Sequence, residues 1–197
     1  MSFFNIVAAT NEDTVVATYE PSKVRSDSYQ SEAELEKEFI RLLCEQGYTY
    51  LPLHTEDELI ANLRSQLEGL NHYQFSDTEW QQFFSDVIAN PNEHIPEKTR
   101  KIQEDNVQVL HRDDGSSKNI TLIDKKNIHN NRLQVINQYE VKQADGARHD
   151  NRYDVTILVN GFPLVHVELK RRGVAIREAF NQINRYQRDS FWAGCGL

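Results

Sequence analysis

The stretch "RYDVTILVNGFPLVHVELK", residues 152–170, decides the fold, because it reads as two strands joined by a turn at Asn160-Gly161. Alternate side chains of a strand share a face. A plain two-residue loop would mix polar and apolar groups on both faces of this hairpin. A shift of one residue places Val155 opposite Val167 and makes one face continuously apolar. Burial therefore favours the shifted register, which requires a bulge or a three-residue loop with a left-handed glycine.

The shifted register also predicts a site, because it brings Asp154 onto the face that carries Glu168 and Lys170. Two opposed carboxylates destabilise a sheet unless a cation lies between them, a raised pKa leaves one of them neutral, or solvent separates them. Mg²⁺ prefers one or two carboxylates together with water and phosphate oxygens. We therefore expect Asp154 and Glu168 to bind Mg²⁺, or Mn²⁺, and Lys170 to orient or deprotonate a water. The alternative is a solvated surface ion pair worth about 0–1 kcal/mol.

The run "RYDVTILVNGFPLVHVELKRRGVAIREAFNQINRY" resembles the nuclease region of type I restriction enzyme R subunits, in the PD-(D/E)xK superfamily. Asp154 matches its aspartate, and Glu168 and Lys170 match its Glu-x-Lys element. Gln182 and Tyr186 match the Gln-x-x-x-Tyr element of the RecB-like branch. Upstream, "VQVLHRDDGSSKNITLIDKKN" and "NNRLQVINQYEV" extend the likeness over most of the chain.

The resemblance implies an α/β fold, with a restriction-endonuclease-like mixed sheet flanked by helices and a helical N-terminal extension. It also implies a cytoplasmic enzyme that cuts unmodified double-stranded DNA after ATP-driven translocation, in complex with methyltransferase and specificity subunits. The sequence contains no G-x-x-x-x-G-K-[ST] phosphate loop, so ATP would belong only to the full-length subunit. We therefore expect an N-terminal fragment without the helicase-like motor domains. Tyr153 replaces the proline of the motif, which the chemistry does not require.

Further residues are candidates for supporting roles around this site. Gln182 and Tyr186 are four apart, so they share a helix face that either covers the site or borders the core. Glu32 or Glu36, in the first predicted helix, could approach the metal, although helix capping explains acidic residues there equally well. His166 lies on the site's face, where we expect a neighbour rather than a general base. The arginines expected to contact DNA phosphates, or to form an ordinary solvated face, are Arg171, Arg172 and Arg177.

The rest of the chain divides by its periodicity into an N-terminal segment 1–27, a mostly helical part 28–104, and a sheet with a closing helix over 105–197. The helical part contributes the first core helix, capped by Ser28 or Ser31, with Gly47 as its stop. A third helix is expected after Ser76, with Glu79 in a capping box.

The distribution of charge bears on the expected partners. Residues 1–100 hold 7 basic and 18 acidic residues, a net of −11, whereas residues 101–197 hold 15 and 12, a net of +3. The predicted site thus lies in the basic half, as DNA binding requires locally. No apolar run approaches the roughly 20 residues that a bilayer requires, so no membrane partner is expected. The alternative functions are a RecB-like repair or recombination nuclease, and a catalytically inactive fragment that binds DNA or a partner.

Overall fold

The computed structural model of the chain describes residues 3–9, 15–20, 31–141, 151–171 and 176–186. It is mixed α/β, as the sequence predicts. The helices are α1 (Glu32–Glu45), α2 (Glu56–Asn71), α3 (Asp77–Phe83), α4 (Ile95–Gln103) and α5 (Ile176–Tyr186), with a π-helical turn η1 (Phe84–Ile88) and a 3-10 turn η2 (Ile128–Asn130). The strands are β1 (Phe3–Ala9), β2 (Val15–Glu20), β3 (Thr49–Tyr50), β4 (Val107–His111), β5 (Ser117–Thr121), β6 (Leu133–Val141), β7 (Asn151–Val159) and β8 (Phe162–Val167).

Capping boxes begin the first three helices. Ser31, Thr55 and Ser76 each accept the backbone N–H three residues on, and the glutamate at that position bonds back to the cap's N–H. Ser31, one of the two predicted caps, begins α1. Gly47, with φ 94°, follows the end of α1 in the left-handed conformation that glycine adopts without strain. Local sequence thus determines where these helices begin and where α1 ends.

The central sheet has the strand order β3-β6-β7-β8. β3 runs parallel to β6 and the other neighbours are antiparallel, so the sheet is mixed, as predicted. Val155 lies opposite Val167, which confirms the shifted register. The two-residue turn Asn160-Gly161, with φ of 51° and 85°, is followed by an irregularity that leaves Leu164 unmatched in β8. A bulge, and not a three-residue loop, therefore accommodates the shift.

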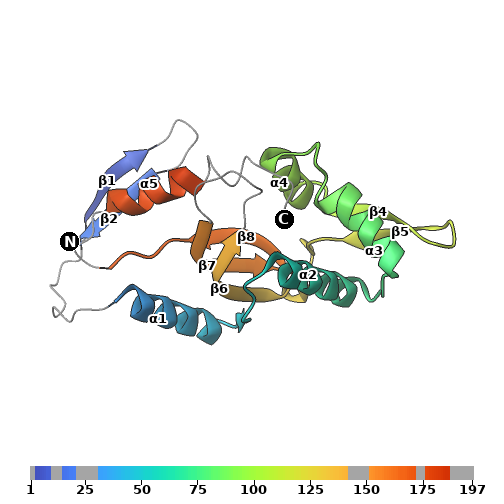
Figure 1. Ribbon diagram of the computed structural model, residues 1–197, viewed down its shortest axis with the longest axis horizontal. Helices are drawn as coiled ribbons and strands as arrows, with labels where there is room; N and C mark the ends of the chain where they lie inside the picture. Colours follow the sequence, from blue (N-terminus) through green and yellow to red (C-terminus); the bar gives the residue numbers. More distant parts are fainter. Residues whose placement is uncertain (1–2, 10–14, 21–30, 142–150, 172–175, 187–197) are drawn as a thin grey trace.

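Helices α1 and α2 cover the two faces of this sheet. Leu43 of α1 packs with Val135 and Val155 in one buried cluster. Leu59 of α2 packs with Ile136, Leu158 and other residues in a second cluster on the opposite face. The sheet is therefore enclosed between the two helices, both of which lie near it in Figure 1.

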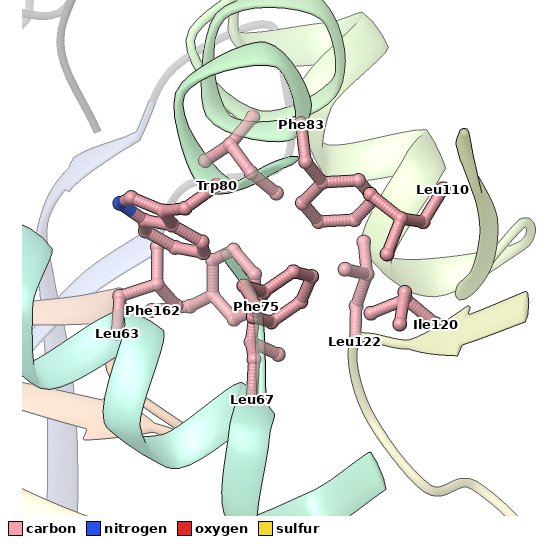
Figure 2. Close-up of a cluster of buried hydrophobic side chains, with 10 residues drawn as sticks. Leu63, Leu67, Phe75, Trp80, Phe83, Leu110, Ile120, Leu122 and Phe162 are labelled. Carbon is pink, nitrogen blue, oxygen red and sulfur yellow. The ribbon is translucent and has the colours of Figure 1, made fainter. Parts of the chain in front are cut away.

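The hairpin β4–β5 does not join the central sheet but forms a separate two-stranded sheet. β4 contacts α3 and β5 contacts α2. Figure 2 shows the core they share, to which β8 contributes Phe162 and the helices, β4 and β5 contribute other side chains. The labelled members of this core are Leu63, Leu67, Phe75, Trp80, Phe83, Leu110, Ile120, Leu122 and Phe162. Phe162 thus connects the central hairpin to the second layer.

The hairpin β1–β2 lies in the segment 1–27, for which the sequence predicted no element. Its strands are antiparallel, with an irregularity between Ile6 and Ala8. β1 also contacts α5, and Figure 1 shows both at the end of the molecule opposite β4–β5. Across the described ranges, no helix has both the length and the apolar character needed to cross a bilayer.

Candidate functional site

The site forms on β7 and just beyond the end of β8, and it brings together the three residues that the sequence singled out. The register that pairs Val155 with Val167 sets Asp154 opposite Glu168. The Oδ2 atom of Asp154 accepts the backbone N–H of Leu169 at 2.8 Å. Lys170 donates to Oε1 of Glu168, with which it forms an ion pair. The two carboxylates therefore meet on one side of the hairpin, beside the ammonium group.

Glu168 is the most enclosed group of the site. Its side chain is 3% exposed, against 19% for Lys170. Within the described part of the chain, the Oε2 atom of Glu168 is buried and has no hydrogen-bond partner. A buried carboxylate oxygen without a donor costs more than the ~1–3 kcal/mol of a neutral group. Such an atom calls for a partner such as a water or an ion, and the neighbouring Asp154 carboxylate makes a divalent cation a suitable one.

The pKa values of the pair move in a direction that agrees with this environment. Burial raises the pKa of Glu168, and the nearby Asp154 carboxylate raises it further, while the hydrogen bond from Lys170 opposes the rise. Burial by itself lowers the pKa of Lys170, but its contact with Glu168 and the charges of Asp154 and Glu32 outweigh burial and raise it. The pKa of each group is thus above its ordinary value, and a bound cation would favour the ionised form of Glu168.

The described residues offer few side chains that could together hold a metal ion. Over the residues that the structure describes, no group of three or more histidine, cysteine, aspartate or glutamate side chains is placed to hold a metal ion. A cation held by Asp154 and Glu168 would take its other ligands from water or substrate. Mg²⁺ is commonly bound in this way, because it gives up its waters reluctantly and takes phosphate oxygens as ligands.

The two candidate glutamates of α1 have different partners. Glu32 Oε1 accepts the backbone N–H of Arg171 at 3.4 Å, and its charge contributes to the raised pKa of Lys170. Glu36 instead accepts the side-chain amide of Asn137 at 2.5 Å and that of Gln138. Glu32 thus lies toward the site, whereas Glu36 is engaged by β6. The sequence had not singled out Asn137 or Gln138, because an amide in a strand looks like any polar surface residue.

His166 is a packing neighbour of the site. Its Nδ1 atom lies 2.8 Å from Oγ1 of Thr156, and its ring stacks on Tyr153 at 4.1 Å. Burial lowers the pKa of His166 to about 4, so the ring is neutral near pH 7. Tyr153, at the position of the motif's proline, is itself buried. These contacts link the residue before Asp154 to β8, the strand that leads into Glu168.

The remaining candidates for roles at the site are Gln182, Tyr186 and the arginines. Gln182 is half-buried and Arg177 is exposed, both on α5, the helix that contacts β1. Arg171, which follows Lys170 beyond the end of β8, is exposed. Arg172 and the side chain of Tyr186 lie outside the described residues. A role for Gln182 and Tyr186 over the site, and DNA contacts by the arginines, therefore stay predictions.

Comparison with known proteins places this geometry in context. The family described as "Type I restriction enzyme R protein N terminus" matches residues 29–194. The Type I restriction enzyme EcoprrI endonuclease subunit of Escherichia coli is 48% identical over 186 residues, which cover 94% of this chain and 58% of that protein. The SsaAORF53P endonuclease subunit of Staphylococcus saprophyticus is 37% identical over 168 residues, or 83% of this chain and 17% of that protein. The chain thus spans little more than half of the first relative and a smaller part of the second.

Proposed function

The chain belongs to the family of type I restriction enzyme R protein N termini, and from this premise we propose that Asp154, Glu168 and Lys170 form a Mg²⁺-dependent nuclease site. The reaction is hydrolysis of a phosphodiester bond in unmodified double-stranded DNA. The relatives are themselves named endonuclease subunits, which supports restriction over a role in repair or recombination.

One observation carries the proposal: the Glu168 carboxylate lies beside that of Asp154, and its buried Oε2 atom has no hydrogen-bond partner among the described residues. A purely structural ion pair with Lys170 would leave no reason to bury this second oxygen unsatisfied. Two carboxylates in one low-dielectric place repel each other unless a proton or a cation intervenes. A divalent cation satisfies both requirements at once.

The residues of the chain have separate roles in this proposal. Asp154 and Glu168 hold the cation, with Mn²⁺ as a possible substitute for Mg²⁺. When bound, the cation polarises a phosphate oxygen and makes a water a better nucleophile. Lys170, held by Oε1 of Glu168, presents its ammonium where it can orient the attacking water or accompany a phosphate. Arg171, Arg172 and Arg177 add positive charge for the DNA backbone.

The wider assembly is also part of the proposal. The full subunit would work in the cytoplasm with methyltransferase and specificity subunits, and ATP-driven translocation would deliver DNA to the site. ATP would act in portions of the relatives that this chain does not span, since it covers 58% of the Escherichia coli protein. The present chain would contribute the cutting site.

A metal titration tests the site directly. We expect calorimetry to detect Mn²⁺ or Mg²⁺ binding by the wild type, and Asp154→Ala to abolish it. Asp105→Ala, which removes an exposed carboxylate near the end of α4, is the matched control and should bind as the wild type does. Equal binding by wild type and Asp154→Ala would refute the site.

Nicking of supercoiled plasmid in Mn²⁺ or Mg²⁺ tests catalysis separately. We expect the wild type to nick and Asp154→Ala to fail. Wild-type chain that binds metal and DNA but leaves plasmid intact would favour the alternative of an inactive DNA-binding unit.

A further inference from the structure

Both central strands reverse their alternation of faces at the level of Asp154. On β6, Ile136 and Tyr139 lie in the same buried cluster under α2, although three residues apart they would face opposite ways in a regular strand. On β7, Tyr153 and Leu158 share that cluster although they are five residues apart. Val155, two residues from Tyr153, lies instead in the cluster under α1, so the reversal on β7 falls at Asp154.

Gln138 is the residue at which β6 reverses. Its φ of 53° is left-handed, which is uncommon for a residue other than glycine. The pairing passes from Asn137 opposite Val155 to Tyr139 opposite Tyr153, so Gln138 stands across from Asp154. A backbone in this region persists only where its surroundings hold it there.

Glu36 of α1 supplies that support. It accepts the amide of Asn137 at 2.5 Å and the amide of Gln138, so two consecutive strand residues reach one carboxylate. Tyr50 donates its hydroxyl to Oδ1 of Asn137 at 2.8 Å, which turns the amide nitrogen toward Glu36. The contact thus fixes both amides on the α1 side, where regular alternation would have separated them.

The same helix also reaches the other half of the site. Glu32 and Glu36 are four residues apart, so they share a face of α1. Glu32 accepts the backbone N–H of Arg171, just beyond Lys170. The first two turns of α1 are therefore bound to β6 through Glu36, and to the segment that follows β8 through Glu32.

We propose that Glu36 is a positioning residue. It holds Gln138 of β6 in the left-handed conformation opposite Asp154, and so directs the Asp154 carboxylate toward Glu168. Glu36 does not contact the reacting atoms; it acts through Asn137 and Gln138. The inference rests on the proposed function, because the geometry that it sets is that of the metal site.

The first experiment measures Mn²⁺ affinity of the 197-residue chain by calorimetry, beside thermal stability. Glu36→Gln replaces one carboxylate oxygen with an NH2 group, so it cannot accept both amides. We expect it to weaken Mn²⁺ binding by about 10–100-fold, as loss of an outer-shell partner typically does. Glu45→Gln, which removes an exposed carboxylate from the same helix, should bind within about twofold of the wild type. Leu110→Val, in the separate core of β4–β5, controls for general loss of stability.

A second pair of variants tests the backbone path. Gln138→Gly and Gln138→Val both lose the amide, but only glycine adopts φ of 53° without strain. We expect Gln138→Gly to bind Mn²⁺ within about fivefold of the wild type, and Gln138→Val to lose at least as much affinity as Glu36→Gln. Equal affinities for these two variants would overturn the role of the left-handed turn.

The outcomes separate this inference from the proposed function. Absence of Mn²⁺ binding by the wild type, or its persistence in Asp154→Ala, would defeat the proposed function. Wild-type binding that Asp154→Ala abolishes and Glu36→Gln leaves unchanged would overturn only the positioning role. The positioning role would also be overturned if Leu110→Val, at a similar fall in melting temperature, weakened binding as much as Glu36→Gln does.

Discussion

Asp154 Oδ2 accepts the backbone N–H of Leu169 at 2.8 Å, so one carboxylate both joins the strands of the hairpin and faces the proposed cation. The bond fixes the chain between Glu168 and Lys170, the two other residues of the site. Asp154 thus contributes to the shape of the site as well as to its charge, and suitable substitutions can separate the two contributions.

Substitution of Asp154 by asparagine or alanine should separate structure from charge. Asp154→Asn keeps an oxygen that can accept from Leu169, so we expect a free energy of unfolding within about 0.5 kcal/mol of the wild type. Asp154→Ala leaves that N–H without its partner and should lose about 1–2 kcal/mol. Urea unfolding measures both, and calorimetry should show weakened Mn²⁺ binding in each. Equal stability of the two variants would contradict a structural role for the bond.

Removal of the Lys170 ammonium should separate catalysis from metal binding. Lys170→Met keeps an apolar side chain of similar length, so we expect Mn²⁺ binding to persist while plasmid nicking falls by about 10²–10⁴-fold. The pKa of Glu168 should rise further in the metal-free protein, because the bond that opposes the rise is lost. Lys126→Met, at an exposed position before η2, is the control. Nicking at the wild-type rate by Lys170→Met would exclude the proposed role.

The sequence could predict the hairpin of the site because its determinants are local. Only one register gives β7 and β8 a continuous apolar face, and that register alone brings Asp154 beside Glu168. A capping box likewise predicted the start of α3 from residues three apart, and Ser31, which begins α1, was one of two predicted caps. The mixed α/β fold followed from the change of hydrophobic period and from family resemblance.

The features that the sequence could not predict depend on contacts between distant residues. The left-handed Gln138 is held by Glu36, which lies 102 residues earlier in the chain. The separation of β4–β5 from the central sheet follows from its packing on α2 and α3, which a period-two pattern does not specify. The orientation of Glu32 toward Arg171 depends on how α1 docks on the sheet. From the sequence alone, helix capping therefore explained Glu32 as well as a role near the site did.

Acid sensitivity of the helical layer should depend on Glu79, which is 4% exposed. Burial alone would raise its pKa, but bonds from Ser76, Tyr73 and Asp113 outweigh burial and lower it. Since the folded pKa is below the ordinary 4.5, this stabilisation is present above pH 4.5 and is lost as pH falls through the folded value. At pH 7, Glu79→Gln should therefore lower the free energy of unfolding by about 2 kcal/mol. As the pH falls, the variant should lose less stability than the wild type does.

Urea unfolding at pH 7 and at several values below pH 4.5 measures this difference. Glu104→Gln, whose side chain in the wild type is 74% exposed, is the control and should follow the wild-type pH profile. A profile for Glu79→Gln that is parallel to the wild type would show that another group controls the acid transition.

Docking of the site hairpin on α2 should be tested at Gly161. A Cβ at Gly161 would lie 2.6 Å from Cα of Leu63, and the residue has φ of 85°, so alanine adds a backbone clash to a strained conformation. Gly115 has a similar φ of 80° but meets nothing within 4 Å, so Gly115→Ala measures the strain alone, about 1–2 kcal/mol. We expect Gly161→Ala to lose about 3 kcal/mol or more.

Metal affinity should change with Gly161 for the same reason. The hairpin that turns at Gly161 carries Asp154 on one strand and leads through the other into Glu168, so displacing it from Leu63 should weaken Mn²⁺ binding. Gly115→Ala, in the separate β4–β5 turn, should leave binding unchanged. Equal stability losses in the two variants would mean that the hairpin moves away from α2 without cost, and that close packing against Leu63 does not hold the site in place.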